Sequence, residues 1–339
     1  MTDGRQDVAG GGEFERIVLL AKIFDASAPD ASSARGTENA EFEVGIGDDA
    51  AVLHLRSDTR LAWTVDAQVE DVHFRRSWLS WRDVGYRSFV AAASDISAMG
   101  ASPWCALSAL SLTPSITDGE LGELAAGQKE AADTVGARIL GGNLSSGVCV
   151  TVTTTLLGKG ARILTRSGAR VGDALWVAGS LGLAAAGLAA LERGMRGDPV
   201  DRAVHAWRRP EPRVLDGLAM SLRANAAIDV SDGLAVDAGR VGEASGVSVV
   251  LDRSLLLARA DDSLGRAAMA VGADLFDLIL TGGEDYALVA ASPVPIPGFS
   301  RVGEIRQGRG VIIRTERGEE RPHEARGFDH FRGRSAASR

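Results

Sequence analysis

The chain contains few of the residues that disulfide-bonded, zinc-binding or redox-active proteins require. Only two of its 339 residues are cysteine, Cys105 and Cys149, and neither has a second Cys or a His at metal-ligand spacing. This argues against a disulfide framework, a structural zinc site and a thiol redox motif. We therefore expect a protein of the reducing cytoplasm.

Positive charge is also scarce. The chain has 37 Lys and Arg residues against 45 Asp and Glu residues, a formal net charge of −8. A general nucleic-acid binder needs a basic surface, so we expect no nucleic-acid partner. ATP is not excluded, because metal ions can screen its phosphates in a carboxylate-rich site.

Long apolar runs are absent as well. The first residues have no apolar core like that of a signal peptide, and the most apolar run, 175–191, is interrupted by glycines such as Gly179 and Gly182. A membrane span needs about 20 uninterrupted apolar residues, so we expect no membrane association. The run is more typical of a buried strand, a glycine turn and a helix.

Several nucleotide and hydrolase motifs are missing. The sequence contains no Walker G-x-x-x-x-G-K-[ST] motif, no G-x-G-x-x-G in a βαβ unit, no protein-kinase signature and no G-x-S-x-G. Any use of ATP must therefore follow another design than the P-loop.

The sequence is rich in short acidic clusters, often beside glycine. The first, residues 44–53, reads VGIGDDAAVL, and it is followed by TVD (64–66), SD (94–95), DVSDG (229–233) and GGED (282–285). Taken alone, each cluster is also typical of a solvated turn. Because adjacent carboxylates repel each other, their recurrence at strand ends and helix starts predicts bound cations.

The pattern of apolar residues predicts an α/β protein of the α+β type. We expect a helix and a loop over 1–43, an N-terminal domain over 44–158 and a C-terminal domain over 159–335. Thr117 and Glu120 predict a capping box for a helix ending near Val135, and glycine-rich residues 141–147 predict an anion-binding loop between two strands. Strands are predicted at 148–157, 174–178 and 226–230, and the last leads into a helix over 234–244. Ser231 and Asp232 suit either a helix cap or an anion site at that helix.

Carboxylates in several loops, a glycine-rich cradle and Arg166 in a turn suit magnesium-assisted phosphoryl transfer. They suit a two-metal hydrolase almost as well, and residue chemistry alone leaves both possibilities open.

Seven segments, in this order, closely resemble the thiamine-monophosphate kinase family, in the superfamily of aminoimidazole ribonucleotide synthetase. They are GIGDDAAVL (45–53), TVDAQVEDVHF (64–74), ASDISAMGASP (93–103), LTRSGARVGD (164–173), DVSDGL (229–234), TGGEDYAL (281–288) and GFDHF (327–331). The resemblance implies the two-domain fold of that synthetase, with an N-terminal sheet that forms the interface of a homodimer. It also implies transfer of phosphate from ATP to thiamine monophosphate, giving thiamine diphosphate, with several Mg²⁺ ions.

The resemblance further implies roles for individual residues, though no general base. The implied metal ligands are Asp49, Thr64, Val65 (through its carbonyl), Asp66, Asp95, Asn143, Asp229 and Asp232. The implied ATP contacts are Gly142, Asn143, Arg166 and Ser231. The implied contacts to thiamine monophosphate are His73, Glu284 and Phe328, of which Phe328 can stack on a flat cationic ring.

The chain departs from the family at two positions. Asn143 stands where the family usually has aspartate, so this implied metal ligand is an uncharged amide. Asp71 stands where the family commonly has glycine. Two rival functions follow: another ATP-dependent reaction of the superfamily, or non-catalytic nucleotide binding. A selenide enzyme would need a reactive Cys in residues 1–40, and a carbamoyl-processing relative would need a C-terminal Cys; both are missing.

Overall fold

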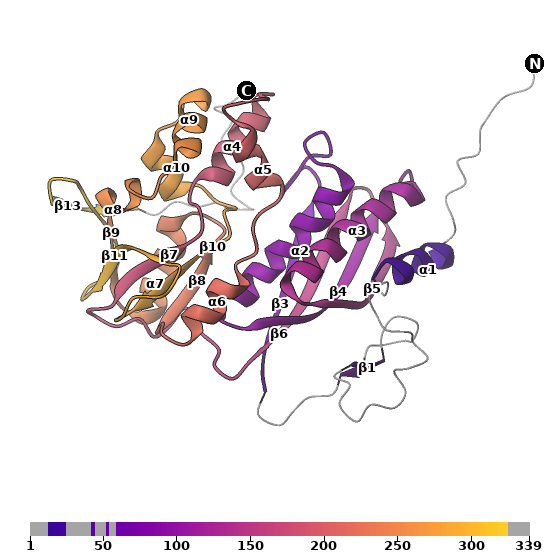
Figure 1. Cartoon of the computed structure of the whole chain (residues 1–339), viewed down its shortest axis with the longest axis horizontal. Coiled ribbons are helices and arrows are strands. Elements are labelled where there is room, and N and C mark those ends of the chain that lie inside the picture. The colour runs from indigo at the N-terminus through magenta and orange to yellow at the C-terminus, as the bar shows by residue number, and fades with distance from the viewer. Residues whose placement is uncertain (1–12, 25–41, 45–51, 54–58, 325–339) are drawn as a thin grey trace, which may run out of the picture. The chain divides into compact units, whose positions relative to one another are not determined.

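The structure, a computed structural model, describes residues 13–24, 42–44, 52–53 and 59–324 (Figure 1). The chain divides into two compact units, Met1–Ile96 with Ala101–Ala161, and Ser97–Gly100 with Arg162–Arg339. Each unit combines helices with a mixed sheet, which confirms the predicted fold class. Two predicted site residues, Asp49 and Phe328, lie outside the described residues.

The first unit is built on a sheet that has four strands in the described part of the chain, in the order β3-β6-β4-β5. Neighbouring strands are antiparallel except β4 and β5, which are parallel. Helices α2 and α3 lie across one face of this sheet (Figure 1). The elements of the unit are α1 (Glu13–Phe24), β1 (Phe42–Val44), β2 (Val52–Leu53), β3 (Arg60–Val69), α2 (Trp81–Ala98), β4 (Ser102–Leu112), α3 (Asp118–Val135), β5 (Arg138–Ser146) and β6 (Thr151–Gly160).

Helix α3 begins and ends as its sequence predicts. The Thr117 hydroxyl accepts the Glu120 N–H, and the Glu120 carboxylate accepts the Thr117 N–H, so the predicted capping box is confirmed. Gly136 ends the helix with φ +73°, a left-handed conformation that costs glycine little.

Glycines also set the distance between α2 and α3. A Cβ atom added at Gly127 would lie 1.9 Å from the Arg82 carbonyl oxygen, and one at Gly85 would lie 1.9 Å from that of Leu124. The two helix backbones are therefore in direct contact at these glycines.

The predicted anion-binding loop at 141–147 is wrong for most of its length. Residues up to Ser146 belong to β5, where Gly142 and Asn143 pair with Ser108 and Ala109 of β4. Sheet hydrogen bonds outweigh the turn preference of these glycines because β4 offers a full partner strand. The next strand starts at Thr151, later than the predicted Val148, which is fully exposed.

The second unit contains, among its described residues, a seven-stranded sheet in the order β13-β12-β9-β11-β7-β10-β8. Only β12 and β9 run parallel in the described part of it. Its strands are β7 (Ala174–Ala178), β8 (Ala226–Val230), β9 (Ser248–Asp252), β10 (Ala287–Ser292), β11 (Ser300–Arg306), β12 (Gly310–Arg314) and β13 (Glu320–His323). The predicted strands at 174–178 and 226–230 are confirmed.

Both faces of this second sheet are covered. One face packs against a large core that includes Leu183, Leu234, Leu264 and Phe276 from four helices, and the other packs against Met220. The helices are α4 (Leu183–Glu192), α5 (Asp201–Arg208), α6 (Val214–Ser221), α7 (Leu234–Ser245), α8 (Arg253–Leu257), α9 (Asp262–Val271) and α10 (Leu275–Thr281). Within the described ranges, no helix is both long enough and apolar enough to cross a membrane.

Candidate active site

Three loops of the second unit meet at one edge of its sheet. Strand β10 pairs with both β7 and β8, so residues 179–182, 231–233 and 282–286 follow or precede strand ends that lie side by side. The Glu284 N–H donates to the Ser231 carbonyl at 2.8 Å, and the Tyr286 N–H donates to the Val230 carbonyl at 2.9 Å. Two of the acidic clusters far apart in the sequence are therefore neighbours in space.

The turn between β8 and α7 is capped from within the helix. The Asp237 Oδ2 atom accepts the N–H groups of Ser231, Asp232 and Gly233, at 3.0, 3.0 and 3.1 Å. Neither Ser231 nor Asp232 caps α7 through its side chain, so the cap alternative left open by the sequence is wrong. Asp229 ends β8 as a buried carboxylate, and Asp232 forms an ion pair with Arg240.

Glu284, the predicted contact to thiamine monophosphate, lies in a loop with unusual backbone angles. Its φ is +66° and that of Tyr286 is +50°, a region that non-glycine residues seldom occupy outside functional loops. The indole N–H of Trp207, a fully buried residue of α5, donates to the Glu284 carboxylate at 2.7 Å. This bond orients the carboxylate.

Asp285, the next residue, has a structural role. Its carboxylate accepts the Gly182 N–H at 2.5 Å and the Ala184 N–H at 2.9 Å, which caps α4 from another segment of the chain. Burial raises the pKa of Asp285 to about 7, against the lowering effect of these backbone bonds. In the same way burial raises the pKa of Asp237 to about 6.

In the first unit, two predicted metal ligands are in contact. The Thr64 hydroxyl of β3 donates to the Asp95 carboxylate of α2 at 2.5 Å. Asp66 lies two residues along the same face of β3, and its carboxylate accepts the Gln68 side-chain amide at 3.1 Å. Val65 lies between them with its side chain on the opposite face, 64% exposed, so any metal contact must come from its carbonyl.

His73 lies in a tight turn after β3. Its Nδ1 atom accepts the Val69 N–H at 3.0 Å, which fixes the ring and leaves Nε2 as the nitrogen that carries the proton in the neutral form. The turn also holds Asp71 at φ +63°, a left-handed conformation that favours glycine.

Asn143 and Asp66 lie on opposite faces of the first sheet. Asp66 shares a row across the sheet with Thr154, Ser108 and Gly142, whereas Asn143 shares the neighbouring row with Ala109. Side chains alternate between faces along a strand, and three strand spacings amount to about 14 Å. One copy of the chain therefore cannot use both side chains on a single metal ion.

Arg166, the predicted ATP contact, is far from Ser231 within the second unit. Its neighbour Thr165 accepts the Ala227 N–H at the start of β8, whereas Ser231 follows the end of that strand. The length of the strand places them roughly 16 Å apart. The structure does not bring these two predicted ATP contacts together.

The predicted metal ligands supply carboxylate, hydroxyl and amide oxygens, which is the donor set that Mg²⁺ prefers. Within the described ranges, however, no three His, Cys, Asp or Glu side chains are grouped closely enough to hold a metal ion. Magnesium commonly takes one or two carboxylates and completes its shell with substrate phosphates and water. The residues present fit magnesium of that kind.

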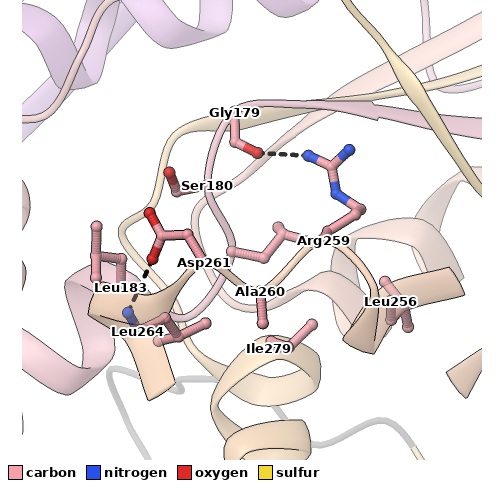
Figure 2. A pocket seen from close by; sticks show the side chains of 10 residues that line it. Gly179, Ser180, Leu183, Leu256, Arg259, Ala260, Asp261, Leu264 and Ile279 are labelled. Atoms are coloured by element: carbon pink, nitrogen blue, oxygen red, sulfur yellow. Dashed lines mark hydrogen bonds between the residues drawn. The ribbon is translucent and has the colours of Figure 1, made fainter. Parts of the chain in front are cut away.

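A small pocket lies beside the Gly179–Gly182 loop (Figure 2). Its floor is apolar and includes Leu256, Leu264 and Ile279. Arg259 lies at its rim and donates from Nη2 to the Gly179 carbonyl at 2.7 Å. Its volume of about 80 Å³ is smaller than that of a closed cavity that holds benzene, about 150 Å³, so it is small for a nucleotide or a thiamine ring.

Sequence reasoning missed Asp237 and Trp207, which hold the predicted site residues in place. An aspartate at the fourth position of a helix and an isolated tryptophan are common structural residues, so the sequence carried no signal of their roles. Asp285 lies within a recognised segment, but its capping of α4 depends on a contact between distant parts of the chain.

Most of the chain is similar to known proteins. Residues 47–159 match the family AIR synthase related protein, N-terminal domain, and residues 170–314 match its C-terminal domain. The chain is 37% identical to a thiamine-monophosphate kinase of Mycobacterium tuberculosis over 273 residues, 80% of this chain and 81% of that protein. It is 33% identical to the Bacillus subtilis enzyme of the same name, over 88% of this chain and 96% of that protein.

Solved structures of thiamine-monophosphate kinases and related proteins are also similar to this chain. The structure described as AaThiL complexed with AMPPCP and TMP has a TM-score of 0.76 and 28% identity, covering 94% of this chain and 97% of that chain. The hydrogenase maturation protein HypE in complex with ATP, at 19% identity and a TM-score of 0.72, over 93% of this chain and 95% of that one, shares the fold. The chain belongs to the thiamine-monophosphate kinase family of phosphotransferases.

Proposed function

We propose that the protein transfers the γ-phosphoryl group of ATP to the phosphate of thiamine monophosphate, giving ADP and thiamine diphosphate. The observation that carries the proposal is the meeting of the DVSDG and GGED loops at one sheet edge. There Glu284 is oriented by Trp207, and the Ser231–Asp232 backbone is fixed by Asp237. The relatives' names and the AMPPCP and TMP bound to AaThiL support the two substrates.

In this proposal oxygen atoms from residues of both units, most of them carboxylates, hold Mg²⁺. Asp49, Thr64, Val65, Asp66, Asp95 and Asn143 serve in the first unit, and Asp229 and Asp232 in the second. Asn143 binds another ion than Asp66 of the same copy, because the two lie on opposite faces of the sheet. The ions supply charge neutralisation for two anionic substrates and stabilise the charge that develops on the transferred group. Gly142, Asn143, Arg166 and Ser231 contact ATP, and Arg166 and Ser231 touch different parts of the nucleotide because they lie roughly 16 Å apart. His73, Glu284 and Phe328 contact thiamine monophosphate.

The reaction needs no strong general base. A phosphate oxygen of thiamine monophosphate is already anionic at neutral pH; it attacks the γ-phosphorus in line with the bond to the leaving oxygen. That bond breaks, its electron pair stays on ADP, and no proton has to move. Positioning and electrostatic stabilisation then account for most of the rate.

We also propose that the protein is a homodimer joined through the first sheet. The face of this sheet opposite α2 and α3 carries large exposed apolar side chains, among them Trp63 at 75%, Val65 at 64% and Leu107 at 44%. Such a patch on a sheet is typical of an interface. Asn143 lies on this face, so it would act close to the partner.

The experiment that tests the proposed reaction is to incubate the protein with ATP, thiamine monophosphate and Mg²⁺ and to measure ADP and thiamine diphosphate. We expect equal amounts of both products from the wild type and a loss of at least about a hundredfold in Asp49→Ala, because a metal ligand is removed. Asp198→Asn, which changes an exposed carboxylate, is the matched control. ATP binding without thiamine diphosphate would instead favour a different acceptor or a non-catalytic protein.

A further inference from the structure

The turn that carries Ser231 and Asp232 is held by a carboxylate that is not itself a predicted site residue. Asp237 is completely buried in the first turn of α7, and its Oδ2 atom accepts three consecutive backbone N–H groups. Together with the bonds from Glu284 and Tyr286 to the Ser231 and Val230 carbonyls, this atom fixes the backbone of the turn. Because Asp237 binds these N–H groups, the Asp232 carboxylate does not cap the helix and can bind other groups.

Arg240, one helical turn after Asp237, joins the two carboxylates. Its Nη1 atom donates to Asp237 Oδ1 at 2.6 Å, and its Nη2 atom lies 2.7 Å from Asp232 Oδ2. Both distances are in the range of charge-assisted hydrogen bonds. The guanidinium is 37% exposed and the Asp232 side chain 25%, so the pair lies at the surface of the turn where a substrate or an ion can reach it.

A cation already beside Asp232 changes what that carboxylate can bind. Its charge is balanced by the guanidinium, so a divalent ion gains less from approaching it and is repelled by Arg240. Mg²⁺ gives up its water reluctantly and binds poorly to a carboxylate so neutralised unless other anions contribute. Substrate phosphates are such anions.

We propose that Arg240 is a positioning residue that lowers the affinity of Asp232 for free divalent cations, so that metal binds there together with substrate phosphates. The inference rests on the proposed function, because it takes Asp232 as a metal ligand. Arg240 acts through Asp232 and has no part in bond making or breaking. Asp237 keeps the turn in place whether or not Arg240 is present.

The test is a titration with Mn²⁺, a paramagnetic substitute for Mg²⁺, in which free Mn²⁺ is measured by electron paramagnetic resonance without nucleotide. We expect Arg240→Gln to bind Mn²⁺ about tenfold more tightly than the wild type. Repulsion by one nearby positive charge lowers the affinity for a divalent ion by at least about that factor, even where the dielectric constant is close to that of water. Arg240→Lys, which keeps the positive charge, should bind Mn²⁺ more weakly than Arg240→Gln.

A double variant locates the effect. Adding Asp232→Asn to Arg240→Gln must remove the gain in Mn²⁺ affinity. The inference is overturned if the double variant keeps the gain, or if Arg240→Gln alone binds Mn²⁺ no more tightly than the wild type. Circular dichroism and thermal unfolding show whether Arg240→Gln folds. If it does not, Arg240→Met is measured in its place, because methionine is uncharged like glutamine and has a similar length.

A separate assay of thiamine diphosphate formation by the wild type distinguishes the two proposals. If the wild type makes thiamine diphosphate and neutral variants bind Mn²⁺ as the wild type does, the inference fails alone. If no thiamine diphosphate forms but the neutral variants bind Mn²⁺ more tightly through Asp232, the inference stands and the proposed reaction fails.

Discussion

At the scale of single residues, two buried aspartates hold the candidate site together. Asp237 and Asp285 both accept backbone N–H groups at the start of a helix, and each connects a functional loop to that helix. A carboxylate at a helix N-terminus is favoured by the helix dipole, yet burial is the larger influence on both groups and raises their pKa values to about 6 and about 7. We therefore expect the stability of the protein to depend on the protonation of both groups.

The raised pKa of Asp285 predicts that stability falls as pH increases. Between pH 4 and pH 7 the folded protein keeps a proton that the unfolded chain, with the ordinary value of 3.8, has lost, so the free energy of unfolding decreases as pH rises through this window. This group can cost the wild type at most about 4 kcal/mol, because each pKa unit corresponds to about 1.36 kcal/mol. In Asp285→Asn that part of the decrease should disappear.

Urea unfolding of both proteins at pH 5 and pH 7.5 measures the difference. The contribution of Asp237 is common to both and cancels. If the free energy of unfolding falls equally in the two proteins, Asp285 does not titrate as described.

A second prediction at this scale concerns Asn143. We expect Asn143→Asp to lower the Mg²⁺ concentration for half-maximal activity by about tenfold, because an amide oxygen is replaced by a charged ligand. Ser145→Asp is the control, since it adds the same charge two residues further along β5, on the same face. Steady-state rates at varied Mg²⁺ concentration give this value for each variant. If both variants lower it equally, Asn143 is not a metal ligand.

At the scale of secondary structure elements, α2 carries Asp95 and crosses α3 in direct backbone contact. Helix α3 can approach α2 only because Gly85 and Gly127 have no side chains. Asp95 in turn accepts the Thr64 hydroxyl.

This crossing predicts opposite effects for two glycines of the same helix. Gly127→Ala should destabilise the protein by about 2–4 kcal/mol, because its Cβ would lie 1.9 Å from the Arg82 carbonyl oxygen and the helices would have to separate. Gly122→Ala, whose Cβ would meet only an Ile23 methyl group at 4.0 Å, should be neutral or more stable by up to about 1 kcal/mol. Urea unfolding of both variants measures this, and equal destabilisation would show that helix propensity rather than the crossing matters.

At the scale of the whole molecule, the uncovered face of the first sheet predicts the state of assembly. Trp63→Glu should convert the proposed dimer into a monomer, because a charge would be buried among apolar side chains. Light scattering after size-exclusion chromatography gives the mass, for which the chain contributes 35.4 kDa. Met269→Glu changes an equally exposed apolar residue of α9 and should leave the mass unchanged; a wild-type monomer would refute the dimer.

Much of this arrangement could be predicted from sequence. The capping box at Thr117, the strands at 174–178 and 226–230 and the helix that follows the second of them depend on local patterns, and the structure has them. The glycine-rich segment at 141–146 was misjudged, because its turn preference is overridden by pairing with β4, 34 residues earlier.

The sequence by itself determined the mixed α/β fold, the family and the set of oxygen-bearing residues, because period, caps and motifs are local properties of the chain. Only the tertiary structure decided which of these residues meet: Thr64 with Asp95, Ser231 with Glu284, and Asp232 with Arg240. It also placed Asn143 and Asp66 on opposite faces of one sheet. Such contacts depend on strand order and register, which arise from the packing of distant segments and leave no local pattern in the sequence.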